Sequence, residues 1–109
     1  MKLSIIIPAY NEEKTIEKIL DKVLKVKLPL EKEIIIVDDN SSDNTFNILQ
    51  KQKNIILLKH EKNKGKGAAI KTAFQKTSGD IIIIQDADLE YDPNDYPKLL
   101  APILENNFS

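Results

Sequence analysis

Four short aliphatic runs, separated by stretches with helical spacing, constrain what this chain can fold into. The runs lie at residues 3–7, 33–37, 55–59 and 81–85. Each is largely continuous in its apolar residues, which is typical of strands covered by helices on both faces of a sheet. Strands that alternate with helices predict a parallel sheet with right-handed crossovers. The expected fold is therefore α/β, and the length of 109 residues allows one domain.

The stretches between the runs predict four helices. Asn11 is a good N-cap for the first helix, and Glu12 and Glu13 then fall in its first turn, where the helix dipole favours acids. The apolar face of this helix consists of Ile16, Ile19, Leu20, Val23 and Leu24. Ser42 or Asp43 is expected to cap the second helix.

Proline and glycine mark the ends of several elements. Pro8 lacks an N–H and restricts the residue before it, so the first strand is expected to stop at Ile7. Gly79 is a natural C′ residue to end the third helix. The fourth helix is expected over residues 95–105, and Pro102 should kink or shorten it.

The fourth aliphatic run ends in a group of carboxylates. Four isoleucines at residues 81–84 predict a central strand that is buried on both faces, and Asp86, Asp88 and Glu90 follow it. Open α/β sheets bind ligands at the carboxyl ends of their strands, and hard oxygen ligands suit a divalent cation that would hold a diphosphate. Solvated loop acids are the alternative, although neighbouring acids repel each other unless a cation neutralises them.

Polar residues also follow the first two runs. Asp38 and Asp39 end the second run, where an acid can accept a hydrogen bond from a ribose hydroxyl or a base N–H. A helix-capping turn explains the same residues equally well. After the first run, Tyr10 offers a ring that could stack on a base and Glu12 offers an acceptor, with a simple turn as the alternative.

The loop at residues 61–67 is basic and has two glycines before a helix. Such a helix N-terminus can cradle an anion, and a flexible basic turn is the alternative. The sequence has neither the P-loop pattern nor the dinucleotide-binding glycine pattern after the first run. His60 is the single histidine and lies in a polar stretch, so it is expected to be solvated. No nucleophile elbow supports a hydrolase triad.

Composition narrows the expected partners. A net charge of −1 gives no support for a nucleic-acid surface. All sixteen basic residues are lysines, so the chain has no bidentate arginine clamp for phosphate. Cysteine is absent, which suits a reducing compartment, and the N-terminal apolar run is too short for a signal peptide or a membrane span. We expect a soluble, cytoplasmic chain whose substrate can still be membrane-associated.

Four segments together carry a resemblance to a known family. They are PAYNEE at residues 8–13, IIIVDDNSSDNT at 34–45, NKGKGAA at 63–69 and IIIIQDADLEYDP at 81–93. In this order and spacing they resemble the GT-A-fold glycosyltransferases of family 2, closest to the polyprenol-phosphate (dolichol-phosphate) mannosyl- or glucosyltransferase branch. The resemblance covers nearly the whole chain. It implies a three-layer, Rossmann-like sheet of four parallel strands in the order 3-2-1-4.

The resemblance also implies an activity and a set of site residues. A sugar would pass from a nucleoside diphosphate sugar, of the GDP-mannose or UDP-glucose type, to a polyprenyl phosphate at a membrane surface. Mg²⁺ or Mn²⁺ would neutralise the leaving diphosphate. The implied nucleotide contacts are Pro8, Tyr10, Glu12, Val37, Asp39, Asp86, Ala87 and Asp88. Asp86 and Asp88 would serve catalysis and, with Glu90, hold the metal; related enzymes often have glutamine where Glu90 stands, so the acid changes the charge around the metal.

Length separates this chain from the family it resembles. Family members are considerably longer, and their acceptor site, usual catalytic acid and basic phosphate-gripping residues lie in the part without a counterpart here. We therefore expect an N-terminal nucleotide-binding half that binds donor and metal and does not turn over unaided. Two alternatives stay open. One is a two-component receiver domain, although its acid pair belongs after the first strand, and the other is a non-catalytic nucleotide-binding module.

Overall fold

The computed structural model describes residues 1–88 and 92–105. Its strands are β1 (Lys2–Ala9), β2 (Glu31–Asp38), β3 (Ile56–Lys59) and β4 (Ile81–Ile84). Its helices are α1 (Ile16–Lys25), α2 (Thr45–Gln50), α3 (Lys66–Phe74) and α4 (Tyr96–Glu105), with a 3₁₀ turn, η1 (Pro93–Asp95), before α4. The helix α4 continues through Pro102, so this proline does not end it. Within the described residues, no helix has the length and apolar character needed to cross a membrane.

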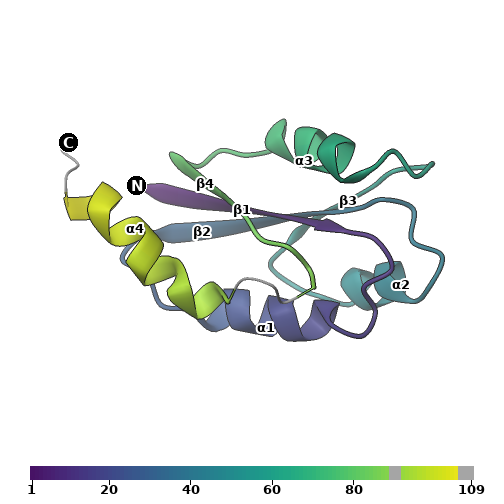
Figure 1. The fold of residues 1–109 in the computed structure, drawn as a ribbon, viewed down its shortest axis with the longest axis horizontal. Coiled ribbons are helices and arrows are strands. Elements are labelled where there is room, and N and C mark those ends of the chain that lie inside the picture. The colour runs from purple at the N-terminus through teal and green to yellow at the C-terminus, as the bar shows by residue number, and fades with distance from the viewer. Residues whose placement is uncertain (89–91, 106–109) are drawn as a thin grey trace.

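The four strands form one parallel sheet in the order β3-β2-β1-β4, which confirms the predicted fold class and strand order. Helix α3 covers one face of the sheet, and α1 and α4 cover the other, where α2 also contributes to the core (Figure 1). Side chains along β1 alternate between the two faces. Ile5 and Ile7 belong to the larger core with α1, whereas Ile6 packs beside Ala69 of α3.

The central, fully buried strand is β1 and not β4. Ile5, Ile6 and Ile7 are fully buried, whereas Ile84 at the end of β4 is 46% exposed. β4 pairs with β1 on one side, and no strand among the described residues pairs with its other side. The prediction of a central strand at residues 81–84 is therefore wrong. An isoleucine run identifies an aliphatic strand, but its position depends on which elements lie beside it.

β1 continues through Pro8 to Ala9, beyond its predicted end. Backbone groups alternate between the two edges of a strand. The carbonyl of Ile6 accepts the Gln85 N–H on the β4 side, and the carbonyl of Ala9 accepts the Asp39 N–H on the β2 side. The nitrogen of Pro8 therefore points to the β4 side, past the end of β4, where the missing N–H costs no ladder hydrogen bond.

Helix α1 begins at Ile16, so the prediction that Asn11 caps it is wrong. Asn11 has a left-handed φ of 53°, a conformation that asparagine tolerates. Its Oδ1 accepts the backbone N–H groups of Ser42 (2.8 Å) and Asp43 (3.3 Å), which draws it away from the helix. At the other end of the predicted apolar face, Leu24 is 40% exposed.

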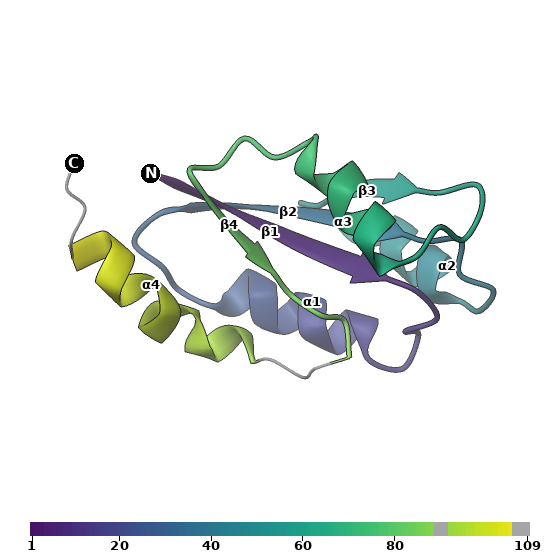
Figure 2. The ribbon, with the colours of Figure 1, turned by 45° about the horizontal axis from the view of Figure 1, so that its top comes forward.

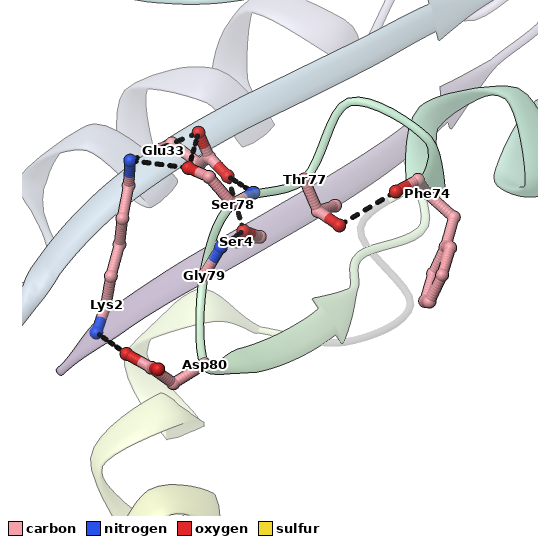
Figure 3. Close-up of polar contacts among 8 residues, drawn as sticks. All are labelled: Lys2, Ser4, Glu33, Phe74, Thr77, Ser78, Gly79 and Asp80. Carbon is pink, nitrogen blue, oxygen red and sulfur yellow. Dashed lines mark hydrogen bonds and ion pairs between the residues drawn. The ribbon is translucent and has the colours of Figure 1, made fainter.

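The starts and ends of α2 and α3 differ from the predictions. The N-cap residue of α2 is Asn44 and not Ser42 or Asp43, although Asp43 Oδ1 accepts the N–H of Thr45, the first residue of the helix, at 2.9 Å. Helix α3 ends at Phe74, so Gly79 is not its C′ residue. Gly79 instead lies against β1 (Figure 3), where an added Cβ would be 2.5 Å from Ser4 Oγ. The position requires glycine because two backbone segments approach closely there.

Candidate functional site

One cavity of about 400 Å³ lies at the carboxyl ends of β1, β2 and β4. Figure 2 shows the start of α3 beside the carboxyl end of β1. The lining residues of the cavity are Pro8, Ala9, Tyr10, Glu12, Asp39, Asn63, Gly65, Lys66, Ala69, Asp86, Ala87 and Asp88. Seven of the predicted ligand residues meet here: Pro8, Tyr10, Glu12, Asp39, Asp86, Ala87 and Asp88. The side chain of Val37 does not, because it is fully buried with Ile6 and Ala69 beneath α3. Glu90 lies outside the described residues.

The loop after β1, which carries Tyr10 and Glu12, is tied to the loop after β2. The backbone N–H of Asn11 donates to Ser41 Oγ at 2.9 Å. The backbone N–H of Glu12 donates to Thr45 Oγ1 at 2.8 Å. These bonds hold the loop at the rim of the cavity, where Tyr10 is one of the lining residues and is 46% exposed.

Asp38 and Asp39 are adjacent in the chain but do different things. Asp38 is fully buried and accepts the N–H (3.1 Å) and the hydroxyl (2.5 Å) of Ser41. It therefore stabilises the turn after β2, as the capping-turn alternative for these residues expects. Asp39 lines the cavity and accepts the backbone N–H groups of Lys64 and Gly65, each at 2.8 Å. Asp39 therefore anchors the glycine loop that leads into α3.

These contacts determine the ionisation of Asp39. Burial by itself raises the pKa of Asp39, but hydrogen bonds from the Lys64 N–H, the His60 ring and the Gly65 N–H outweigh it, so the pKa lies below its ordinary value. Asp39 is thus a carboxylate at neutral pH and can only accept hydrogen bonds. A carboxylate at the cavity wall suits a ligand with an N–H or O–H donor.

His60 is buried, and the prediction that it is solvated is wrong. The residue is 6% exposed. Its Nδ1 lies 2.8 Å from Asp39 Oδ1, and its Nε2 lies 2.8 Å from Oγ1 of Thr72 in α3. The polar residues beside His60 in the sequence gave no sign of this environment, because its partners are 21 and 12 positions away.

Asp86 and Asp88 flank Ala87 just after β4. Ala87 is buried, and its carbonyl accepts the hydroxyl of Thr15, the N-cap residue of α1, at 2.6 Å. This bond fixes the turn between the two acids. Lys66, the first residue of α3, forms an ion pair with Asp86. Lys66 belongs to the loop predicted as an anion cradle, whereas nothing in the sequence indicated the role of Thr15.

A buried pair holds the end of β4 behind these acids. The hydroxyl of Tyr96 in α4 donates to Gln85 Oε1 at 2.7 Å, and both residues are 1% exposed. Burial raises the pKa of Tyr96, so its hydroxyl stays protonated and remains a donor. The strand end that carries the acid pair is therefore anchored to α4.

A divalent metal fits between Asp86 and Asp88 when a bound diphosphate supplies further ligands to it. Among the described residues, no three His, Cys, Asp or Glu side chains gather closely enough to enclose a metal. Asp86 and Asp88 supply hard carboxylate oxygens at the cavity. Mg²⁺ commonly takes one or two carboxylates together with substrate phosphates and waters. The donor set therefore fits a metal–diphosphate complex better than a closed structural metal site.

An open parallel sheet with a ligand cavity at the carboxyl ends of its strands is the arrangement of nucleotide-binding α/β proteins. Within that class, residues 4–109 match the family described as Glycosyl transferase family 2. The chain belongs to this family. Its membership removes the receiver-domain alternative.

Two relatives show which members the chain is similar to. The undecaprenyl-phosphate 4-deoxy-4-formamido-L-arabinose transferase of Proteus mirabilis is 38% identical over 107 residues, which cover 92% of this chain and 33% of that protein. The dolichol-phosphate mannosyltransferase of Pyrococcus furiosus is 35% identical over 106 residues, which cover 94% of this chain and 30% of that protein. The chain thus spans about a third of the length of these relatives.

Three solved structures confirm the GT-A fold. S. aureus TarS in complex with UDP-GlcNAc has a TM-score of 0.84 and 32% identity, covering 97% of this chain and 32% of that one. Glucosyl-3-phosphoglycerate synthase from Mycobacterium tuberculosis, with Mn²⁺, UDP and glucosyl-3-phosphoglycerate, has a TM-score of 0.78 and 32% identity, covering 94% of this chain and 39% of that one. The mannosyltransferase PcManGT from Pyrobaculum calidifontis, with GDP-Man and Mn²⁺, has a TM-score of 0.77 and 29% identity, covering 85% of this chain and 29% of that one.

Proposed function

We propose that this chain is the donor-binding part of a glycosyltransferase and that a nucleoside diphosphate sugar binds in the cavity at the carboxyl ends of β1, β2 and β4. The observation that supports this most is the convergence of Asp39, Lys66 and the acid pair on one cavity. In this cavity Asp39 can accept a hydrogen bond from a nucleoside. The acid pair and Lys66, which line the same cavity, suit a diphosphate with its metal. Family membership, and the UDP and GDP sugars bound by structural neighbours, support the same assignment.

We assign the nucleoside to the side of the cavity formed by the loops after β1 and β2. Tyr10, which is half-exposed, stacks its ring on the base, and Pro8 forms part of the wall. The ionised carboxylate of Asp39 accepts an N–H of the base or a ribose hydroxyl. Glu12 offers a further acceptor at the rim. Uracil and guanine both carry a ring N–H that a carboxylate can accept, so these contacts suit UDP and GDP sugars alike.

We assign the diphosphate to the side formed by β4 and the start of α3. Asp86 and Asp88, with Glu90 as a further proposed ligand, hold Mg²⁺ or Mn²⁺, which when bound acts as a Lewis acid on the leaving diphosphate. Lys66 adds positive charge next to Asp86. The N-terminal end of α3 lies beside the same space and favours an anion there.

The acceptor that we propose is a polyprenyl phosphate, the class named by both relatives. Its phosphate oxygen is already anionic, so attack on the anomeric carbon needs no strong general base. A bond forms between that oxygen and the anomeric carbon, the bond from this carbon to the diphosphate breaks, and the nucleoside diphosphate leaves. We place this reaction at the cytoplasmic face of a membrane, where such a lipid is presented.

Isothermal titration calorimetry of the folded chain with UDP and GDP sugars, with and without Mn²⁺, tests the proposal. We expect metal-dependent binding that Asp88→Asn weakens by about tenfold or more, since a metal ligand is lost. Asp21→Asn is the matched control, because Asp21 is exposed on α1 and pairs with Lys25. Absence of binding by a folded sample, or equal binding by Asp88→Asn, contradicts the proposal. In a version extended to the length of these relatives, donor binding without sugar transfer to a polyprenyl phosphate would instead favour the non-catalytic module.

A further inference from the structure

A chain of three hydrogen-bonded side chains, two of them buried, joins three elements next to the cavity. His60 follows the last residue of β3, Asp39 follows β2, and Thr72 belongs to α3. The side chains of His60 and Asp39 are 6% and 4% exposed. None of the roles proposed above requires a histidine, so the burial of this one has another cause.

The ionisation of Asp39 fixes the orientation of the ring. Because its pKa lies below the ordinary value, Asp39 is a carboxylate and can only accept hydrogen bonds. Nδ1 of His60 therefore carries the proton that points at Asp39 Oδ1. In the neutral ring, Nε2 then accepts the hydroxyl proton of Thr72. Both ring nitrogens are thus engaged, and the ring has one orientation.

The orientation of Asp39 in turn determines the path of the glycine loop. Its Oδ1 accepts the Lys64 N–H as well as the His60 ring, and its Oδ2 accepts the Gly65 N–H. Gly65 has a φ of 95°, in the region that favours glycine, and is the N-cap residue of α3. Asn63 and Gly65 line the cavity, as Asp39 itself does. A rotation of Asp39 would therefore release two backbone anchors at the wall of the cavity.

We propose that His60 is a positioning residue for nucleotide binding: it holds Asp39 in the orientation that pins residues 63–65 and presents a carboxylate to the base or ribose of a nucleoside diphosphate. This inference rests on the proposed function. His60 is not one of the residues that line the cavity, so it acts through Asp39 and not on the ligand. Thr72, which does not line the cavity either, holds the other ring nitrogen.

Three substitutions of His60 separate positioning from packing. His60→Asn places an amide N–H close to the position of Nδ1 and keeps the bond to Asp39. His60→Gln extends its amide toward Thr72 and loses the bond to Asp39, and His60→Phe fills the space with neither bond. With UDP or GDP and Mn²⁺, the dissociation constant should rise about tenfold for His60→Gln and His60→Phe and markedly less for His60→Asn. Thr72→Val removes only the hydrogen bond to His60 Nε2 and keeps a similar side-chain volume, so the dissociation constant should rise less.

Hydrogen exchange of the Lys64 and Gly65 amides, measured by NMR, gives a second readout that needs no ligand. Exchange should accelerate in His60→Gln and His60→Phe and stay close to wild type in His60→Asn. Folded His60→Phe that binds nucleotide like wild type and keeps slow exchange at both amides overturns the proposal. So does an affinity loss in all three variants that tracks the free energy of unfolding, with no recovery in His60→Asn. If wild type binds no nucleotide, the proposed function fails, and exchange of the two amides still decides whether His60 positions the loop.

Discussion

Replacing Glu33 with glutamine should lower the stability of the fold and reduce its sensitivity to acid. Glu33 Oε2 accepts the Ser4 hydroxyl (2.5 Å) and the Ser78 N–H (2.6 Å) (Figure 3). Its Oε1 accepts the Ser78 hydroxyl (3.0 Å) and lies 3.4 Å from the ammonium of Lys2. Its side chain is 13% exposed. Glu33 therefore joins the connection between α3 and β4 to the beginnings of β1 and β2.

The pKa of Glu33 gives the size of the effect. Burial raises this pKa, but hydrogen bonds from Ser4, Ser78 and Lys2 outweigh burial and lower it from 4.5 to about 2. A difference of about 2.5 between the unfolded and folded pKa corresponds to roughly 3 kcal/mol, at about 1.36 kcal/mol for each pKa unit. Glutamine keeps one acceptor oxygen, so we expect a loss of about 2 kcal/mol at neutral pH. That is a substantial part of the roughly 5–15 kcal/mol that stabilises a typical domain.

The pH dependence follows from the direction of the shift. Folding lowers the pKa of Glu33, so the stabilisation is fully present above pH 4.5 and is lost as the pH falls toward about 2. Urea unfolding followed by circular dichroism, from neutral pH down to about pH 3, measures it for wild type and Glu33→Gln. Glu31→Gln is the control, since Glu31 is an exposed acid on the same strand. The stability difference should narrow below pH 4.5. The reasoning would be refuted if wild type and Glu33→Gln had the same free energy of unfolding at neutral pH. It would also be refuted if the difference between them were as large at about pH 3 as at neutral pH.

Three other substitutions test separate parts of the molecule. Gly79→Ala should destabilise by about 1–3 kcal/mol in thermal unfolding, because its Cβ would lie 2.5 Å from Ser4 Oγ, whereas Gly67→Ala, with nothing within 4 Å, should not; equal effects would contradict the close approach. Lys32→Met should cost about 1 kcal/mol in urea unfolding, because the Lys32 ammonium donates to three carbonyls at the end of α1; unchanged stability would show that these bonds contribute nothing. Lys66→Met should weaken calorimetric binding of a nucleoside diphosphate with Mn²⁺ several-fold, because it removes a positive charge from the side of the cavity assigned to the diphosphate. It should not lower the affinity for Mn²⁺ alone, because the Lys66 ammonium pairs with Asp86 and so competes with the metal. Unchanged nucleotide affinity would remove Lys66 from the site.

Local patterns in the sequence account for most of the fold. Aliphatic runs, and apolar spacing between residues 16 and 24, identify the strands and the first helix, and their alternation is enough to predict a parallel sheet. The edge position of residues 81–84 does not follow from their composition, because burial depends on the neighbouring elements. The start of α1 is likewise non-local, since Asn11 bonds to Ser42 and Asp43 in another loop.

Some residues of the candidate site can be predicted from local sequence, and others depend on contacts between distant segments. Asp39, Asp86 and Asp88 come shortly after strands, so the rule that parallel strands gather ligands at their carboxyl ends is enough to expect them together. His60 and Thr15, by contrast, contact residues 21 and 72 positions away. A contact between separate loops leaves no periodic pattern in the sequence. These two residues therefore became visible only in the folded chain.

The position of the metal tests the proposed function most directly. Crystals grown with saturating Mn²⁺ and a UDP or GDP sugar, with data collected at the manganese absorption edge, would locate the ion by its anomalous signal. We predict a peak within bonding distance of the Asp88 carboxylate and the diphosphate oxygens, with the base against Tyr10. An intact fold whose cavity holds neither manganese nor nucleotide under those conditions would contradict the assignment of this cavity to a sugar donor.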